Sequence, residues 1–272
     1  MGNPGFESGN DPLAEDWNIT ATAGAASSGS TLLAANPVPR DAARRTCFPG
    51  ASLGSSCSYL NTSLCLDSGD LICYRATALA ARNRFKLRAR WYAGDMSCGT
   101  VIEEKRRADN AIMKVRSSLL PGSIERVNAG EPLSESMAAG GEGEGAPLQY
   151  LMELASRHAA GPSCTVRYRR EAWISSTAYV RVSFDMDPEG HALTVLPPAV
   201  DSPGWERVDL PGVIVEFKFE HEAPQWMGDI ARRVDLRRRS IPKYLLCIDH
   251  LARSRDFQHI AELPRWRTAW TA

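Results

Sequence analysis

The residues most able to do chemistry lie in one short segment in which cationic side chains occupy every second position. These cations are Arg82, Arg84, Lys86, Arg88 and Arg90. Alternate residues of a β-strand share a face, so a strand here would carry all five cations on one side and Phe85, Leu87 and Ala89 on the other. Neighbours on that face would lie roughly 6.6 Å apart and repel by about 2.5 kcal/mol at an effective dielectric near 20. The segment is therefore predicted to face solvent, acidic side chains or an anionic ligand.

The same alternation of charged residues recurs in five further segments. The residues that share a face are Glu103, Lys105 and Arg107; Lys114 and Arg116; Arg167, Arg169 and Glu171; Arg181, Ser183, Asp185 and Asp187; and Glu216, Lys218 and Glu220. A sheet that curls until such faces meet would enclose a polar lumen, where Lys and Arg bind phosphate oxygens and Glu or Asp hold a divalent metal. This interpretation is favoured over a set of solvated outer faces.

The elements that must position these side chains are mainly strands. Strands are predicted at residues 59–66, 82–92, 100–107, 111–117, 165–174, 179–185 and 213–219, with a turn at 109–110. Val215 and Phe217, on the uncharged face of the last strand, are expected to be packed. Pro147 and Pro224 each open a predicted helix. Residues 1–57, rich in Gly, Ala, Ser and Pro, are expected to be a disordered or atypical leader.

The overall charge excludes some classes of protein. The 272 residues include 32 basic and 32 acidic ones, but residues 82–116 and 232–272 each carry a net charge of +6. The zero total, and the lack of aromatic residues interleaved with the cations of the basic run at 237–244, argue against a specific nucleic-acid binder. The sequence lacks an apolar run of 18 residues and a secretory signal, so a membrane span is not expected and the expected compartment is the cytoplasm.

Sequence motifs for other chemistries are weak. Seven scattered cysteines without a C-x-x-C pair are expected to be reduced core residues. Residues 50–54 fit G-x-S-x-G, the motif that carries a nucleophilic serine. The sequence predicts no apolar strand before them and no helix after them, so a chance match is the better explanation. The sequence contains neither the G-x-x-x-x-G-K-[ST] loop nor the G-x-G-x-x-G motif that bind nucleotide phosphates. A bound nucleotide would therefore be held by side chains.

Several segments, taken in order, resemble the VTC domain, the polyphosphate polymerase member of the triphosphate tunnel (CYTH-like) superfamily. The similar segments are residues 63–68 with Tyr74, then 82–92, 103–107, 215–219 and 231–244. The resemblance covers roughly residues 58–250 and leaves 251–272 as a C-terminal tail. It implies an α+β fold, with an antiparallel β tunnel barrel, a charged lumen and a few flanking helices. It also implies transfer of the terminal phosphate of ATP to a polyphosphate chain, with Mn²⁺ or Mg²⁺ as cofactor.

The resemblance assigns roles to individual residues. Triphosphate binding is expected from Lys86, Arg88, Arg90, Lys114, Arg116 and Ser240. Catalytic, lumen-lining roles are expected for Lys105, Arg169, Arg181 and Lys243. Glu216 is the expected metal ligand. Phosphoryl transfer needs positioning and charge neutralisation more than covalent catalysis, and a cage of cations supplies both. The expected ligands are ATP and polyphosphate or another polyanion, and a membrane-protein partner is left open.

One family feature is not found in the sequence. Family members begin with a strand of the type E-x-K-Y, whose acid and lysine complete the tunnel, and residues 1–57 contain no such segment. Three hypotheses follow. The chain is a polyphosphate polymerase fed by ATP, a hydrolase of the same fold that cleaves triphosphate or polyphosphate, or a non-catalytic polyanion-binding module. The missing strand favours the third.

Overall fold

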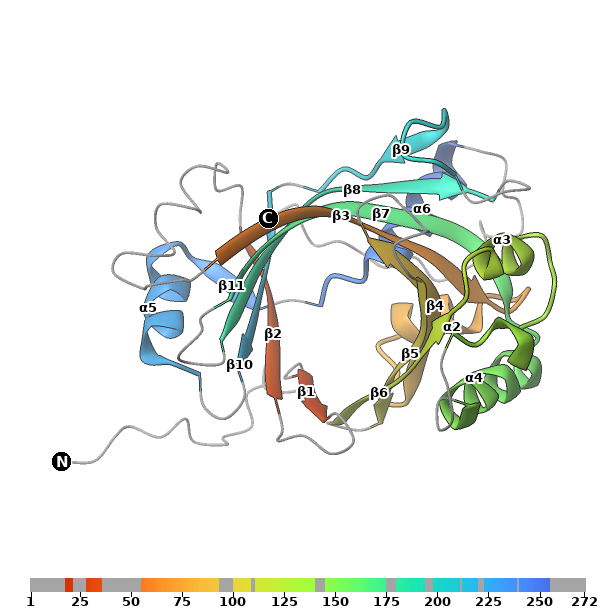
Figure 1. Ribbon diagram of the computed structural model, residues 1–272. Helices are drawn as coiled ribbons and strands as arrows, with labels where there is room; N and C mark the ends of the chain where they lie inside the picture. Colours follow the sequence, from red (N-terminus) through yellow and green to blue (C-terminus); the bar gives the residue numbers. More distant parts are fainter. Residues whose placement is uncertain are drawn as a thin grey trace.

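The structure is a computed structural model with an α+β fold built on one large, strongly curved sheet (Figure 1). It describes residues 18–21, 28–35, 55–92, 100–108, 111–139, 145–174, 180–193, 198–210, 212–219, 223–238 and 240–254. The strands are β1 (Asn18–Ala21), β2 (Ser28–Ala35), β3 (Ser55–Asp67), β4 (Arg84–Tyr92), β5 (Thr100–Ala108), β6 (Ala111–Leu119), β7 (Gly161–Ile174), β8 (Arg181–Ala192), β9 (Trp205–Arg207), β10 (Ile214–Phe219) and β11 (Leu236–Arg238). The helices are α2 (Ile72–Ala78), α3 (Ser123–Asn128), the short η3 (Glu135–Met137), α4 (Gly145–Arg157), α5 (Gln225–Arg233) and α6 (Lys243–Ser254).

The strands close into a ring. Within the described part of the chain the order of pairing is β1-β6-β5-β4-β3-β7-β8-β10-β2, and β2 pairs again with β1. Strand β1 lies parallel to β6, whereas the other pairings around the ring are antiparallel. Strands β9 and β11 add to the edges of β8 and β2. The expected antiparallel barrel is therefore confirmed, with one parallel contact where it closes.

The outer face of the barrel is apolar and packs under helices. Val215 and Phe217 of β10 are buried against Met227 and Ile230 of α5, which confirms the expected packed face. Helices α3 and α4 cover β3 to β6 in the same way, through a second apolar cluster that includes Leu148 of α4. Each fully buried side chain of this kind stabilises the fold by about 1.5–3 kcal/mol. Because Leu87 and Ala89 of β4, and Val215 and Phe217 of β10, face outward to these helices, the charged residues that alternate with them face inward.

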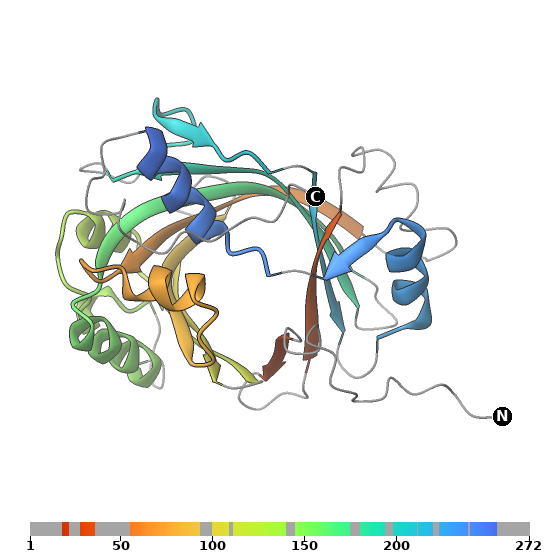
Figure 2. The ribbon, with the colours of Figure 1, turned by 180° about the vertical axis from the view of Figure 1, so that it is seen from behind.

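Helices α2 and α6 pack together at one end of the barrel, on the side nearer the viewer in Figure 2. Asp67, at the end of β3, accepts three backbone N–H bonds from the turn and first residues of α2. The same carboxylate accepts a hydrogen bond of 2.8 Å from the hydroxyl of Tyr244 in α6. Tyr74 of α2 in turn donates a hydrogen bond to Asp249 of α6. This network fixes the start of α6, where Lys243 lies.

The N-terminal segment differs from the expectation of a leader without regular structure. Strands β1 and β2 lie within residues 1–57, and β3 already begins at Ser55. Strand β2 fills the position beside β10, and its sequence, SGSTLLAA, contains no charged residue. Gly, Ser and Ala have weak strand propensity, so local sequence does not announce this strand.

Some expectations fall outside the described residues: the turn at 109–110, most of the glycine-rich stretch at 140–145, and the tail from 255 onward. Four cysteines whose side chains the structure describes, Cys65, Cys73, Cys164 and Cys247, are free and buried, as expected. None of the helices in the described ranges has the length and hydropathy needed to cross a bilayer.

Candidate functional site

A cavity of about 150 Å³ lies inside the barrel and is lined by cationic side chains from five strands and from the start of α6. Nine cations of the described residues line it: Lys86, Arg88, Arg90, Lys105, Lys114, Arg116, Arg170, Lys218 and Lys243. Three carboxylates, those of Glu103, Asp185 and Glu216, form ion pairs with cations of this set. The cavity therefore has a formal excess of six positive charges, which suits a polyanion better than a single small anion.

One layer of the cavity is organised around Glu103. In register, Glu103 of β5 lies opposite Arg88 of β4 and Arg116 of β6. Its carboxylate accepts hydrogen bonds of 2.7 Å from the Nε atoms of both arginines, and Arg90 Nη1 lies 3.6 Å away. Burial alone would raise the pKa of Glu103, but the three guanidinium groups hold it well below its usual range. Glu103 is therefore an anion at the centre of three arginines.

The next layer has no acid. Lys86 of β4, Lys105 of β5 and Lys114 of β6 lie directly opposite one another across the three strands. None of them has an ion-pair partner within 4.0 Å among the described residues. Burial, with neighbouring cations, lowers the pKa of Lys86 to about 8 and those of Lys105 and Lys114 to about 7. A row of like charges whose Cβ atoms are about 5 Å apart is destabilising unless an anion lies against it.

The opposite wall combines cations with two acids. Arg170 of β7 makes a bidentate contact with Asp185 of β8, at 2.6 and 2.7 Å, and its Nη2 atom also donates to Glu216 of β10 at 2.9 Å. Lys243 Nζ donates to Asp185 at 2.7 Å, and Lys218 Nζ lies 3.3 Å from Glu216. Burial would raise the pKa of both acids, but Lys243 and Arg170 lower that of Asp185, and Lys218 and Arg170 lower that of Glu216. Both carboxylates are therefore ionised.

An aromatic ring and a helix terminus complete the cavity. Tyr168 of β7 is buried, and the Nζ atom of Lys243 lies over its ring, 4.5 Å from the centroid. Lys243 is the first residue of α6, so the positive end of that helix also faces the cavity. The helix start and the Lys243 ammonium act in the same direction, and both favour a bound anion.

The structure brings together eight of the eleven residues predicted for the site. These are Lys86, Arg88, Arg90, Lys105, Lys114, Arg116, Glu216 and Lys243. Ser240 lines an adjoining cavity of about 70 Å³ that shares Lys86 and Lys105 with the main one. Arg181 lies on the inner face of β8 but beyond the cavity lining, and its Nη2 atom donates to the hydroxyl of Tyr59 at 2.7 Å. Arg169 is exposed on the other face of β7.

Arg170 takes the cavity position that was expected for Arg169. The inner face of β7 carries Val166, Tyr168 and Arg170, and the pairing with β8 is irregular between Arg167 and Arg169. Because residues 169 and 170 are both arginine, the alternation of charge left the choice of face ambiguous. The sequence reasoning therefore missed Tyr168 and Arg170.

Lys218 was also missed as a site residue, although a signal for it existed. The chain contains only five lysines among its 32 basic residues, and all five line this one cavity. The remaining basic residues are arginines. Lysine is a compact and strongly hydrated point charge that suits phosphate oxygens approaching from several directions. The rarity of lysine is visible in the sequence, and the structure shows that all five lysines line the lumen.

Two carboxylates converge at a point where a divalent metal could be held. Asp185 and Glu216 both accept a hydrogen bond from the same atom, Nη2 of Arg170. Mg²⁺ and similar hard cations are often held by one or two carboxylates, with substrate phosphates and water completing the shell. Within the described part of the chain no three His, Cys, Asp or Glu residues gather to hold an ion alone. The residues present therefore fit a divalent metal that Asp185 and Glu216 would share with phosphate.

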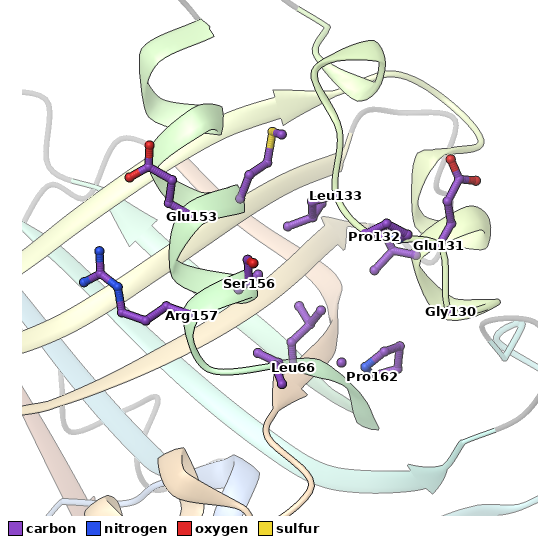
Figure 3. Close-up of a pocket in the computed structure, with 15 residues that line it drawn as sticks. Leu66, Gly130, Glu131, Pro132, Leu133, Glu153, Ser156, Arg157 and Pro162 are labelled. Atoms are coloured by element: carbon purple, nitrogen blue, oxygen red, sulfur yellow. The ribbon is translucent and has the colours of Figure 1, made fainter.

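A larger groove, of about 940 Å³, lies outside the barrel beside α4 and the turn that follows α3 (Figure 3). Its lining is mostly apolar and includes Leu66, Leu133 and Met152. The charged residues that border it are two acids, Glu131 and Glu153, and a single arginine. A polyanion has no cationic cage here, so the candidate site is the smaller, charged cavity.

The structure is a closed barrel, antiparallel except for one contact, whose lumen combines nine cations with three acids among the described residues. The chain belongs to the VTC domain family, whose model matches residues 26–252. The matched region begins just before β2, so it includes the uncharged strand that pairs with β10. A comparison with curated proteins gave no match.

Three solved structures are similar to this chain at low identity. A structure from Hippeastrum, described as a candidate adenylyl cyclase with a dominant triphosphatase activity, is 13% identical with a TM-score of 0.43, over 81% of this chain and 95% of that one. A candidate adenylate cyclase of Bacillus halodurans is 10% identical with a TM-score of 0.41, over 80% and 94%. A protein of Pyrococcus horikoshii OT3 is 9% identical with a TM-score of 0.37, over 83% and 99%. The family assignment depends on the family model alone.

Proposed function

We propose that this chain is a polyphosphate polymerase-like phosphotransferase that moves the terminal phosphate of ATP onto a polyphosphate chain inside its barrel. The observation that carries the proposal is the lysine row of Lys86, Lys105 and Lys114, which faces the lumen and forms no ion pair within 4.0 Å among the described residues. A buried cationic row persists when its ligand, rather than the fold, supplies the counter-charge. A linear chain of phosphates, with about one negative charge for each phosphate, is a ligand of the required length and charge.

The proposed reaction exchanges one phosphoanhydride bond for another. A terminal oxygen of the polyphosphate chain attacks the γ-phosphorus of ATP, a new P–O–P bond forms, and the bond to the β-phosphate breaks to release ADP. Lys105, Lys114 and Arg88 would neutralise the charge on the transferring phosphoryl group, while Arg170 and Lys243 would hold the neighbouring phosphates. The role of these residues is to align two anions that would otherwise repel each other.

A divalent metal, Mn²⁺ or Mg²⁺, is part of the proposal. Glu216, together with Asp185, would hold it, and phosphate oxygens would complete its shell. The ion would supply charge neutralisation at the phosphates. If Glu216→Gln kept full metal-dependent activity, this assignment of the metal ligand would fail.

A second function is favoured by one specific observation. Strand β2, beside β10, contains no charged residue, whereas family members carry an acid and a lysine in their first strand. A barrel in which β2 supplies neither group could retain polyanion binding and lose turnover. The second candidate is therefore a non-catalytic polyanion-binding module, and a hydrolase is the outcome if water rather than phosphate attacks.

The test is incubation of the purified protein with ATP and Mn²⁺, followed by separation of the products on a gel. Long phosphate chains support the polymerase, orthophosphate without chains supports the hydrolase, and triphosphate binding without turnover supports the binding module. The double variant Arg88→Ala, Arg90→Ala tests the site itself, with Arg169→Ala as a matched control on the outer face. Equal triphosphate affinity in the double variant and the wild type would refute all three readings.

A further inference from the structure

Glu103 stands out because it is an acid at the centre of a site that must bind a polyanion. It is 1% exposed and lies in register between Arg88 and Arg116. On charge alone such a residue weakens anion binding, because its carboxylate repels phosphate. The neighbouring row, Lys86, Lys105 and Lys114, has the same three-strand arrangement without an acid. Glu103 must therefore make another contribution to the site, one that offsets the repulsion between its carboxylate and phosphate.

The hydrogen bonds of Glu103 restrict the side chains of two neighbouring arginines. Arg88 binds it through Nε at 2.7 Å and through Nη2 at 2.5 Å, and Arg116 binds it through Nε at 2.7 Å. Within the described residues Arg116 makes no other hydrogen bond, so its two terminal amino groups stay available. The side chains of Arg88 and Arg116 are 26% and 52% exposed, and an untethered arginine at that exposure would sample many rotamers.

We propose that Glu103 is a positioning residue that holds Arg88, Arg90 and Arg116 in one layer with their free amino groups directed at the phosphates. The inference deepens the proposed function and rests on it. Glu103 acts through the arginines and not by contact with substrate or metal. Its two oxygens are already engaged by two guanidinium groups, with a third group at 3.6 Å. Arginines ordered in advance lose less conformational freedom when the ligand binds, and this raises affinity and fixes the phosphate geometry.

The sign of one substitution separates positioning from simple charge. Glu103→Gln removes a negative charge from a polyanion site, so electrostatics alone predicts tighter binding of inorganic triphosphate. The positioning role predicts the opposite, an increase of about tenfold in the triphosphate Kd. Affinity for hexacyanoferrate(II), a polyanion without phosphate geometry, should not fall, since it responds to charge alone. Isothermal titration calorimetry of the full chain measures both ligands.

Glu104→Gln is the matched control. Glu104 is the next residue of β5, is equally buried, and holds Arg106 and Tyr150 on the outer face instead. Glu104→Gln removes one negative charge and one buried carboxylate, as Glu103→Gln does. Because Glu104 holds groups on the outer face, triphosphate affinity should be unchanged. If Glu103→Gln does not fold, Glu103→Asp decides, because it keeps the charge and withdraws the carboxylate by one methylene. A rise of threefold or more in its triphosphate Kd supports the proposal.

The outcomes distinguish this inference from the proposed function. If the wild type binds triphosphate and Glu103→Gln binds it equally or more tightly, the positioning role is refuted and the site stands. An unchanged Kd for Glu103→Asp refutes it in the same way. If the wild type does not bind triphosphate at all, the proposed function fails, and the role of Glu103 toward that ligand fails with it.

Discussion

Lys105 should stabilise the complex with triphosphate and destabilise the free protein. It is the middle residue of the lysine row, opposite Lys86 and Lys114. Burial, with Lys86 and Arg88 adding to the effect and Glu216 opposing it, lowers the pKa of Lys105 to about 7. The ordinary lysine pKa is about 10.4, and each tenfold change in a dissociation constant corresponds to about 1.4 kcal/mol. At pH 8 the lysine therefore costs the fold up to about 3 kcal/mol.

Lys105→Met removes the charge and keeps a side chain of similar length. The variant should be more stable than the wild type by about 1–3 kcal/mol, which raises the unfolding temperature by roughly 2–10 °C in a chain of this size. It should also lose a charged hydrogen bond to phosphate, of about 1.5–3 kcal/mol, which raises the triphosphate Kd by roughly 10- to 150-fold. Thermal unfolding and calorimetric titration check the two effects.

Lys105→Met is expected to raise stability and to lower triphosphate affinity, so a general loss of folding cannot produce the predicted result. A variant that is less stable and binds triphosphate normally would show that Lys105 serves the fold and not the ligand. The wild type gives a further check through its pH dependence. Unfolded Lys105 and Lys114 bind more protons than the folded residues between about pH 7 and 10, so the stability of the free protein should rise with pH across that window. Lys105→Met should flatten the rise.

Three further predictions concern the ligand, the opposite wall and the end of the barrel. A bound anion raises the lowered pKa values of Lys105 and Lys114, so triphosphate binding takes up protons. The triphosphate Kd should therefore rise at least tenfold from pH 7 to pH 9. Calorimetric titration in two buffers of different ionisation enthalpy measures the proton uptake, and no net uptake would contradict this role of the two lysines. Arg170→Ala should lower the free energy of unfolding by about 1.5–3 kcal/mol, because Asp185 and Glu216 lose their shared guanidinium and keep only Lys243 and Lys218. Arg169→Ala should be neutral, and equal denaturation midpoints for the two variants would contradict the face assignment. Asp67→Asn should lower the free energy of unfolding by about 2–4 kcal/mol in urea, with the exposed Asp70→Asn as control; a small effect would show that the carboxylate is not what joins α2 to α6.

The charged faces of most strands could be predicted from the sequence because alternation is a local signal. Lys86, Arg88 and Arg90 point inward as expected, since the residues between them have an apolar outer layer to join. Arg169 and Arg170 could not be assigned by the same rule. Two adjacent arginines fit either face, and only the contacts with β8 and β10 show that Arg170 is the one that faces Asp185 and Glu216.

The closure of the barrel could not be read from local sequence. Strands β1 and β2 are weak strand formers, and their places are set by pairing with β6 and β10, which lie far along the chain. The partners of Glu103 and of Arg170 come from other strands as well, so a count of acids gave no sign that these groups hold arginines in place. Sequence therefore predicted the charges of the site, and the pairing of distant strands determined their arrangement.

The measurement that tests the central claim most directly uses the five lysines of the chain, all of which line the cavity. Protein labelled with ¹³C in the lysine ε-carbons gives NMR signals from that cavity alone. Addition of inorganic triphosphate should shift the signals of Lys86, Lys105 and Lys114 most strongly, and should raise their pKa values, at one equivalent of ligand. If triphosphate binds while none of the five signals moves, the ligand lies outside the lumen and the account is contradicted.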